Sequence, residues 1–420
     1  MTSTVVFAPV GTALRTSWVL VAKTLRNRGD EVYFFDPNPI LCRLLRQEGL
    51  GESIIQFNDG RSAKLPLSSK RDAFILDFNV KNFRKSYETI QSEYANFHYN
   101  LERLDVDVCL FWNDYRSIGV VAAENKNIDC LFLENGYDPG TIQIDTAGVN
   151  RNSSISGFST SEVCSLQRPY ELPKKLEVAN VSSLKKNSLV TGFISKVFND
   201  PGAARLSIEH RLPNIKELLP QQNEQPTLPS SYVFVPFQVH DDTQIQYNSP
   251  IIDDMSSFLT VVRQAVGAVS PDQTVVVKEH PSDRHRINYA DLQTQFSDVC
   301  WFTNYDIEEL IASAQAVVTI NSSVGFQALA KGVPVVTVGD ALYDSAPNVW
   351  SANNLSEVRE ELESALETDV DEQKVNSYVE SVRDNLFIPG TPTKFSNKTV
   401  RHIIGYIDYL ISTEQDKRFI

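Results

Sequence analysis

The sequence predicts an α/β protein with two Rossmann-like domains, each built on a parallel sheet, closed by C-terminal helices. Two observations carry this prediction. Short β-branched runs alternate with helical segments along the chain, and a stretch rich in proline and glutamine divides the series in two. A chain of 420 residues is long enough for two domains with separate cores. We expect domains at 1–205 and 231–390, a linker at 206–230, and a helix at 391–420 that returns towards the first domain.

The first half alternates strands and helices. Its strands are expected to be short apolar runs, at Thr4–Ala8, Glu31–Asp36, Ser53–Phe57, Asp107–Asn113 and Asp129–Glu134. The helices between them are expected at Thr16–Arg28, which Gly29 ends, at Asn38–Glu48 with Pro39 in its first turn, and at Lys81–Arg103. Residues 136–161, rich in Gly, Asn, Ser and Thr, are expected to form a long functional loop.

The second half repeats this rhythm. Its strands are expected at Tyr232–Val239, Thr274–Glu279, Cys300–Thr303, Ala316–Ile320 and Pro334–Val338. Its helices are expected at Asp253–Val269, Ser356–Glu367, Glu372–Asn385 and Asn397–Ile411. Because consecutive βαβ units give parallel strands, the carboxyl ends of the strands in each half should meet at one sheet edge.

Composition narrows the class of protein. A net charge of −14 argues against a nucleic-acid partner, which would require a basic stripe. Five scattered cysteines without a Cys-x-x-Cys pair fit a reducing compartment. The start of the chain does not resemble a signal peptide, and no apolar run is long enough to span a bilayer, so a cytoplasmic protein is expected. Neither a Walker loop nor zinc-ligand spacing is found, and no metal is expected.

Charged and imidazole side chains follow the strand expected at Thr274–Glu279. Proline ends the strand directly after them, at Pro281. Ligands of open α/β sheets bind beyond the carboxyl ends of the strands. His280 could donate to a phosphate, Lys278 could neutralise its charge, and Pro281 would fix the turn. A His-Pro turn that only packs is the alternative.

A second polar group follows the strand expected at Ala316–Ile320. Asn321, Ser322 and Ser323 precede a helix expected to start near Val324. Free amides at a helix N-terminus bind anions, and Gly325 would allow close approach of the backbone. We expect this group and His280 to meet one phosphate, the alternative being an ordinary helix cap.

A third group follows the first strand of the second half and contains Gln238, His240, Asp241, Asp242 and Gln244. The two glutamines are candidate donor ligands that could contact a sugar, ribose or base. Asp242 is a reserve candidate for a catalytic carboxylate. A polar loop that only caps the sheet is the alternative.

Two carboxylates lie near the end of the first half. Glu134 ends the last strand expected there, and Asp145 lies in the polar loop that follows. Glycosyl transfer needs carboxylates of this kind, to remove a proton from the acceptor or to attack the anomeric carbon. A solvated loop with turn-forming Asp and Gly is the alternative.

Five motifs, in order between about residues 130 and 340, carry a family resemblance: Glu134-x-Gly136-Tyr137, Gly148-Val149-Asn150, Phe237-Gln238-Val239-x-x-Asp242-x-Gln244-Ile245, Lys278-x-His280-Pro281 and Asn321-Ser322-Ser323-Val324-Gly325. Together they resemble the capsule polysaccharide biosynthesis/export proteins of the KpsS/LipB type, which are related to KpsC. The first ~130 residues share only the rhythm of strands and helices.

The resemblance implies a GT-B glycosyltransferase of capsule or surface polysaccharide biosynthesis. It implies transfer of a sugar such as Kdo from a CMP-activated donor to a lipid or glycan acceptor, with the acceptor on the first domain and the nucleotide sugar on the second. The active site would lie in the cleft between the domains. No cofactor beyond this co-substrate is implied, and peripheral contact with a membrane or export machinery would suit the role.

Two other functions remain open at this stage. A CDP-alcohol phosphotransferase of similar architecture would share the phosphate site. A non-catalytic component of polysaccharide export would not need Glu134 and Asp145 beside His280. Saturable CMP binding that is lost in His280→Ala would favour a transferase, and a chain that binds no nucleotide would favour the non-catalytic component.

Overall fold

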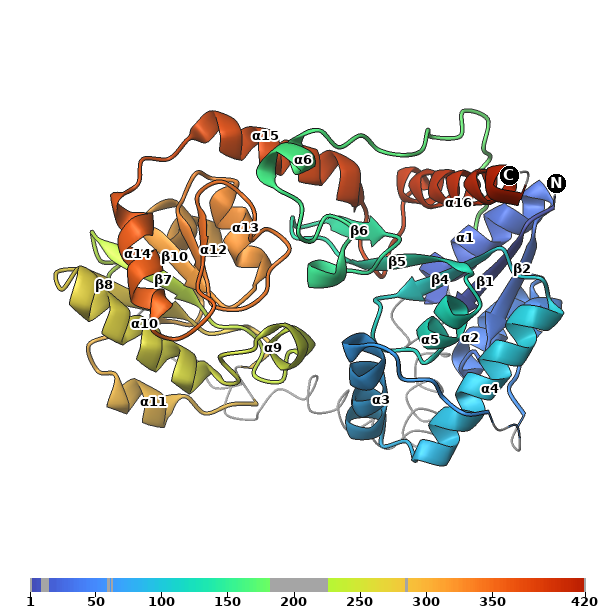
Figure 1. Cartoon of the computed structure of the whole chain (residues 1–420), viewed down its shortest axis with the longest axis horizontal. Helices are drawn as coiled ribbons and strands as arrows, with labels where there is room; N and C mark the ends of the chain where they lie inside the picture. Colours follow the sequence, from blue (N-terminus) through green and yellow to red (C-terminus); the bar gives the residue numbers. More distant parts are fainter. Residues whose placement is uncertain are drawn as a thin grey trace. The chain divides into compact units, whose positions relative to one another are not determined.

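In a computed structural model, the chain forms two compact α/β units (Figure 1). The first comprises Met1–Ser154, Gln167–Arg205 and Asp384–Ile420, and the second comprises Ile155–Leu166 and Leu206–Arg383. The structure describes residues 2–8, 15–58, 61, 63–181, 226–283 and 286–418. Most of the linker predicted at 206–230 lies outside these described residues.

The borders of the units differ from a simple division of the chain. Residues 155–166 join the second unit, where Thr160 Oγ1 donates to the carbonyl of Ser345 (2.7 Å) and Ser381 Oγ donates to that of Val163 (2.5 Å). Conversely, the residues from Asp384 onward belong to the first unit. Short segments of the chain therefore belong to the other unit than their neighbours in the sequence. The amino-acid composition of these segments does not reveal this.

The sheet of the first unit has the order β13-β6-β5-β4-β1-β2-β3 among the described residues. The strands are β1 Thr4–Ala8, β2 Glu31–Phe35, β3 Ile54–Ile55, β4 Val108–Trp112, β5 Asp129–Asn135, β6 Thr141–Asp145 and β13 Phe387–Pro389. β1 to β5 run parallel, whereas β6 is antiparallel to β5 and to β13. Because β1 lies between β2 and β4, the strand order reverses there, and ligands of such sheets bind at this point.

β6 lies inside the segment predicted to be a long loop, and that prediction is wrong for residues 141–145. Ile142 and Ile144 are fully buried in the core, as alternation in a strand requires. A hairpin joins β5 to β6, with Gly136 N donating to the carbonyl of Thr141 (2.9 Å) and Gly140 at a φ of +77°. β6 has only five residues and is flanked by glycines and small polar residues, so it was not recognised in the sequence.

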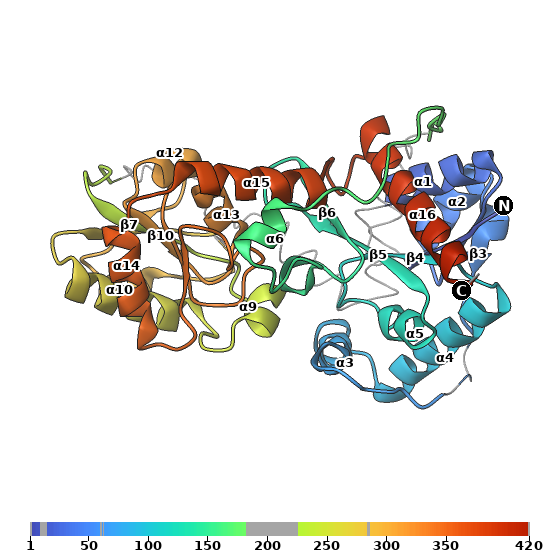
Figure 2. The ribbon, with the colours of Figure 1, turned by 45° about the horizontal axis from the view of Figure 1, so that its top comes forward.

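Helices cover both faces of this sheet (Figure 2). They are α1 Arg15–Arg28, α2 Pro39–Gln47, α3 Lys70–Phe83, α4 Tyr87–Arg103, α5 Gly119–Asn125 and α16 Asn397–Arg418. α1, α2 and α16 pack on one face and α3, α4 and α5 on the other. The helix predicted at Lys81–Arg103 is two helices, because Arg84 adopts a left-handed φ of 53° and Ser86 caps α4.

The C-terminal helix α16 completes the core of the first unit. Val400, Ile403, Ile404 and Ile407 are fully buried in the cluster that also contains Trp18 of α1. The last helix of the chain therefore packs on the first helix.

The sheet of the second unit is parallel throughout the described residues, with the order β12-β11-β10-β7-β8-β9. The strands are β7 Tyr232–Pro236, β8 Thr274–Lys278, β9 Cys300–Phe302, β10 Ala316–Thr319, β11 Val335–Thr337 and β12 Val349–Ser351. The helices are α6 Thr160–Cys164, α9 Thr243–Asn248, α10 Met255–Val269, α11 Ala290–Gln295, α12 Ile307–Ala312, α13 Ser323–Leu329, α14 Glu357–Glu367 and α15 Glu372–Leu386, the last of which ends in the first unit.

The predicted fold class, two Rossmann-like α/β units built on parallel strands, is confirmed, with the antiparallel strands β6 and β13 added to the first sheet. Across the parts of the chain that the structure describes, no helix combines the length and apolarity needed to cross a bilayer.

Candidate functional site

Three polar loops of the second unit leave neighbouring strands at the same sheet edge. β10, β7 and β8 are adjacent and parallel, so the loops that begin at Ile320, Phe237 and Glu279 all start at carboxyl ends. β8 and β10 are two strand spacings apart, about 10 Å. The predicted donor ligands thus lie where an open sheet binds its ligands.

A pair of side-chain amides joins two of these loops. Gln238 Nε2 donates to Asn321 Oδ1 (3.0 Å), and the backbone N–H of Asn321 donates to Gln238 Oε1 (3.2 Å). Asn321 Nδ2 also donates to the carbonyls of Gln244 and Asn248, at 3.1 and 3.0 Å. Gln238 and Asn321 are buried, so their side chains hold the loops together and are not presented to a ligand. Gln238, Asn321 and Gln244 were predicted to touch the donor directly, but the hydrogen bonds of all three support the loops.

His280 and Lys278 form the cationic and hydrogen-bonding part of this edge. Lys278 ends β8 and is buried, whereas His280 is partly exposed. Burial lowers the pKa of His280; the carboxylate of Asp283 opposes this shift and Lys278 adds to it. His280 Nδ1 accepts from the backbone N–H of Ser282 (3.1 Å), so the proton of the neutral ring resides on Nε2. His280 is therefore a hydrogen-bond donor near neutral pH, as a phosphate ligand requires.

A buried carboxylate that sequence reasoning missed lies next to His280. Asp283 is fully buried and accepts from the backbone N–H of His240 (2.7 Å) and from His240 Nδ1 (3.0 Å). Tyr289 Oη and Arg286 Nη1 also donate to it, both at 3.4 Å. Asp283 therefore joins the loop after β7 to the loop after β8 and fixes the ring of His240. The sequence signal that could have identified Asp283 was an acidic residue two positions after His280-Pro281.

Asp242, the reserve catalytic carboxylate, caps a helix. Its Oδ1 accepts from the backbone N–H of Gln244 (2.9 Å) at the start of α9. Burial raises its pKa, against the hydrogen bonds from Gln244 and Gln238. Gln244 Oε1 accepts from Asn248 Nδ2 (2.8 Å) within the same helix.

The Ser-Ser-Val-Gly segment begins α13. Ser322 is its N-cap and accepts from the backbone N–H of Val324 (3.2 Å), as predicted for a cap. Tyr343 Oη donates to the carbonyl of Ser322 (2.6 Å). A Cβ at Gly325 would lie 2.1 Å from that Tyr343 oxygen, so the glycine is required by a tyrosine of the same unit. Contact of Ser322 and Ser323 with a phosphate stays a prediction.

The first unit presents carboxylates at its carboxyl edge. Glu134 lies near the end of β5, partly exposed, and its Oε2 accepts from Asn113 Nδ2 (3.3 Å) beyond β4. Asp114 lies two residues beyond the end of β4 and is buried; its Oδ2 accepts from Asn152 Nδ2 (2.7 Å) and Arg71 Nη1 (3.4 Å). Burial raises the pKa of Asp114 to about 6, although Arg71 and Asn152 lower it. The sequence showed Asp114 after an apolar strand, but this signal was not used.

Asp145 does not fit the catalytic role predicted for it. It is fully buried and accepts from the backbone N–H groups of Ala147 (2.8 Å) and Ser154 (2.9 Å) and from the hydroxyls of Ser153 and Ser154. Burial raises its pKa, while these bonds lower it. Its carboxylate organises the loop after β6, so Glu134 is the remaining candidate of the pair.

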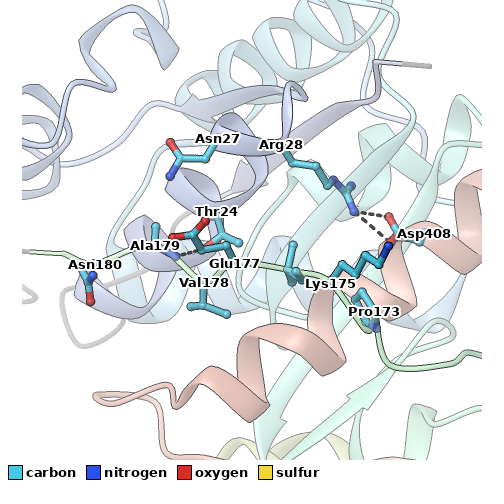
Figure 3. Close-up of a pocket in the computed structure, with 11 residues that line it drawn as sticks. Thr24, Asn27, Arg28, Pro173, Lys175, Glu177, Val178, Ala179, Asn180 and Asp408 are labelled. Atoms are coloured by element: carbon cyan, nitrogen blue, oxygen red, sulfur yellow. Dashed lines mark hydrogen bonds and ion pairs between the residues drawn. The ribbon is translucent and has the colours of Figure 1, made fainter.

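A pocket of about 600 Å³ lies elsewhere in the first unit (Figure 3). It is lined by the end of α1, residues 173–180 and Asp408 of α16. Arg28 reaches Asp408 there, and the N–H of Ala179 donates to Thr24 Oγ1 (3.1 Å). Arg28 also bonds Asp30, which accepts from Ser3 just before β1, so this pocket lies at the amino edge of the sheet. It contains none of the predicted site residues.

No cluster of three or more His, Cys, Asp or Glu suited to a metal ion occurs within the described ranges. The carboxyl edge of the sheet in the second unit carries an ammonium group and an imidazole that suit an anion. The carboxyl edge of the sheet in the first unit carries Glu134 and Asp114.

Comparison with known proteins points to the second unit. A sequence model of the capsule polysaccharide biosynthesis proteins matches residues 210–368. Protein FixF of Sinorhizobium fredii is 28% identical over 236 residues, which cover 56% of this chain and 49% of FixF. The capsule polysaccharide modification protein LipB of Neisseria meningitidis serogroup B is 23% identical over 268 residues, or 56% of this chain and 63% of LipB.

The capsule polysaccharide export protein KpsS of Escherichia coli is 31% identical over 125 residues, 28% of this chain and 32% of KpsS. The chain thus spans less than two thirds of each relative.

Solved structures resemble the chain only distantly. The KpsC beta Kdo 2,7 transferase of Thermosulfurimonas dismutans shares 14% identity at a TM-score of 0.38, with 91% of this chain and 99% of that one covered. A UDP-GlcNAc 2-epimerase of Methanocaldococcus jannaschii shares 13% identity at a TM-score of 0.36, covering 97% and 100%. Similarity at this level does not distinguish a transferase from an epimerase.

Proposed function

We propose that this chain, whose residues 210–368 match the sequence model of the capsule polysaccharide biosynthesis proteins, is a glycosyltransferase of capsule or surface polysaccharide synthesis. A sugar such as Kdo, carried by CMP, is the donor that the sequence motifs favour. The acceptor is a lipid or a glycan.

One observation carries the proposal. Within the matched region, Lys278 and His280 end β8 at the edge where the loops after β7 and β10 are bound to each other. A neutral imidazole with its proton on Nε2 and an ammonium group suit one phosphate. The phosphodiester of a CMP-linked sugar carries one negative charge, which the ammonium group of Lys278 can balance without a divalent cation while His280 donates a hydrogen bond.

The chemistry assigned to the chain follows from these groups. The bond between the sugar and the phosphate oxygen breaks, and its electron pair stays on the phosphate, where Lys278 and His280 stabilise the charge. The acceptor oxygen forms the new bond to the sugar and gives up its proton. Glu134 is the carboxylate assigned to this step, as the base or as a nucleophile that first holds the sugar. The cleft that would bring the two edges together stays a prediction.

The test is mass spectrometry of products after incubation with a panel of nucleotide sugars and with lipid and glycan acceptors. We expect a product one sugar heavier than its acceptor with a CMP-linked donor. In His280→Ala, product formation should fall and CMP binding should weaken by about tenfold or more. Both should be unchanged in Lys374→Gln, an exposed site of the same unit. Transfer of a phospho-alcohol from a CDP donor would instead establish a phosphotransferase. A chain that binds no nucleotide and forms no product would refute the proposal in favour of a non-catalytic export component.

A further inference from the structure

One segment of this acidic chain is strongly basic. Residues 61–85 contain seven Lys and Arg against two Asp, a net charge of +5, whereas the whole chain carries −14. The remaining chain therefore carries −19. The basic segment consists of α3 (Lys70–Phe83) and the residues that lead into and out of it. Arg71 and Lys85 pair with carboxylates outside the segment, so the exposed cations Lys64, Lys70 and Arg84 are the ones that would attract an anionic partner.

Exposed apolar side chains gather along the same part of the chain. Among the residues that the structure describes, six large hydrophobic side chains are exposed, and four of them fall between residues 67 and 99. They are Leu67, Val80, Tyr87 and Tyr99, exposed by 46, 42, 45 and 42%. Leu67 precedes α3, Val80 lies on it, and Tyr87 begins α4 directly after it. Large exposed apolar residues concentrated in one region mark an interaction surface.

The two sides of α3 have different roles. Ile75 and Phe78 are buried in the core of the first unit, where Phe78 contacts the rings of Phe83 and Tyr115. Ser69 and Asp72 form a capping box that fixes the start of the helix. The inner side therefore anchors the helix, and substitutions on the outer side need not disturb the core.

The outer side combines cations with apolar groups. Lys70, Asp77, Val80, Lys81 and Arg84 are exposed at helical spacing. Lys81 pairs with Asp77 at 2.7 Å, but both are exposed, so this pair contributes little. Lys70 and Arg84, at the two ends of the helix, add positive charge, and Lys64 is exposed just before it.

We propose that this α3 surface, made of Lys64, Leu67, Lys70, Val80, Arg84 and Tyr87, binds the headgroup region of an anionic phospholipid bilayer. Single apolar side chains among basic residues suit a lipid interface, where the ring and alkyl groups enter the acyl boundary and the long cationic side chains reach phosphates. The centre of a protein–protein interface is instead depleted of charged residues such as lysine, whereas Lys64 and Lys70 lie among the apolar groups of this surface. The inference concerns attachment only and stands or falls separately from the proposed reaction.

The first measurement is co-sedimentation of the full chain with vesicles. Vesicles of phosphatidylcholine with about one third phosphatidylglycerol should bind the protein at low salt, and vesicles of phosphatidylcholine alone should not. Raising the salt to about 0.5 M should release it, because screening shortens the electrostatic range to a few ångströms. Absence of binding to the anionic vesicles at low salt would overturn the proposal.

The second measurement assigns the binding to α3. Each cation near an anionic surface contributes roughly fivefold to partitioning, so Lys64→Gln, Lys70→Gln and Arg84→Asn together should weaken it about a hundredfold. Asparagine is chosen at position 84 because it tolerates the left-handed φ of 53° there. Val80→Asp alone should also weaken binding, through loss of the apolar contact.

The matched control removes three exposed lysines elsewhere in the same unit: Lys174→Gln, Lys394→Gln and Lys398→Gln. It has the same net charge as the α3 triple variant and should bind vesicles like the unmodified chain. Equal losses in the two triple variants would mean that net charge alone acts and would overturn the assignment. Sedimentation velocity without lipid tests whether the α3 surface binds a second copy of the chain instead. A dimer that forms in the unmodified chain and is lost in the α3 triple variant would show that it does.

Discussion

The carboxyl edges of the two sheets differ in the way their polar groups are held. In the second unit, Gln238 with Asn321 and Asp283 with His240 tie three loops together through buried side chains. Lys278 and His280 lie at this fixed edge. In the first unit, Glu134 is partly exposed and accepts from Asn113 Nδ2 (3.3 Å) and from the backbone N–H of Asn135 (2.8 Å).

In the proposed reaction, this difference separates two tasks. An edge whose loops are already fixed around Lys278 and His280 binds an anion at little reorganisation cost, which suits the constant part of a donor. An edge that presents carboxylates suits a group that loses a proton during the reaction. The family model matches residues 210–368, which include the loops that carry Lys278 and His280.

The largest expected effect comes from the partly exposed carboxylate of the first edge. Glu134→Gln should lower turnover by about 10²–10⁴-fold, because the glutamine can neither accept a proton nor attack. CMP binding, measured by calorimetry, should not change, since the anion edge is untouched. Glu52→Gln, an exposed site of the same unit, is the control. Unchanged turnover in Glu134→Gln would remove this residue from the reaction and leave Asp114 as the next candidate.

The buried carboxylate of the first unit should affect stability rather than chemistry. Asp145→Asn places an amide among four donors, so the free energy of unfolding in urea should fall by about 3 kcal/mol. Turnover per folded molecule should be nearly normal. A variant as stable as the unmodified chain that has lost turnover would restore Asp145 as a catalytic residue.

The amide pair of the second edge can be tested by a double-mutant cycle. Gln238→Ala and Asn321→Ala should each lower the free energy of unfolding, with a coupling energy of about 1–2 kcal/mol because two hydrogen bonds join them. CMP affinity should fall in both, since the loops are no longer fixed. Additive effects on stability would mean that the loops are held by other contacts.

A smaller effect on the free energy of unfolding concerns His402, which lies on α16 in the first unit. Burial, together with the positive charges of Arg168 and Lys398, lowers the pKa of His402 to about 4. The unfolded imidazole has a pKa of about 6.5, so below that pH the unfolded chain binds a proton that the folded chain does not. Stability should therefore fall as the pH drops from about 6.5 to about 4. His402→Gln should flatten this part of the unfolding profile, and an unchanged slope would assign it to other groups.

The sequence predicted the parallel strands well, because each is a short apolar run that ends in polar residues. β8 and its Lys-Glu-His-Pro end are the clearest case. The sequence did not reveal the strands that form by pairing with residues far away in the chain. β13 pairs with β6 across more than two hundred residues, and neither strand is long enough to stand out locally.

The site shows the same limit. Helix capping by Ser322 is local and was predicted, but the roles of Asp283 and Asp145 follow from burial and from donors that only the folded chain brings together. A sequence of acids and serines does not show which carboxylate is enclosed. Asp145 therefore looked as available as Glu134 until the strands were placed.

The central claim, that the edge carrying Lys278 and His280 binds the phosphate of a nucleotide donor, is tested most directly by calorimetry with CMP. The unmodified chain should bind CMP saturably, and His280→Ala should weaken binding by about tenfold or more, as loss of one charge-assisted hydrogen bond requires. Lys374→Gln should leave the affinity unchanged. CMP binding of equal affinity in His280→Ala, with the fold intact by circular dichroism, would contradict the account and place the nucleotide elsewhere.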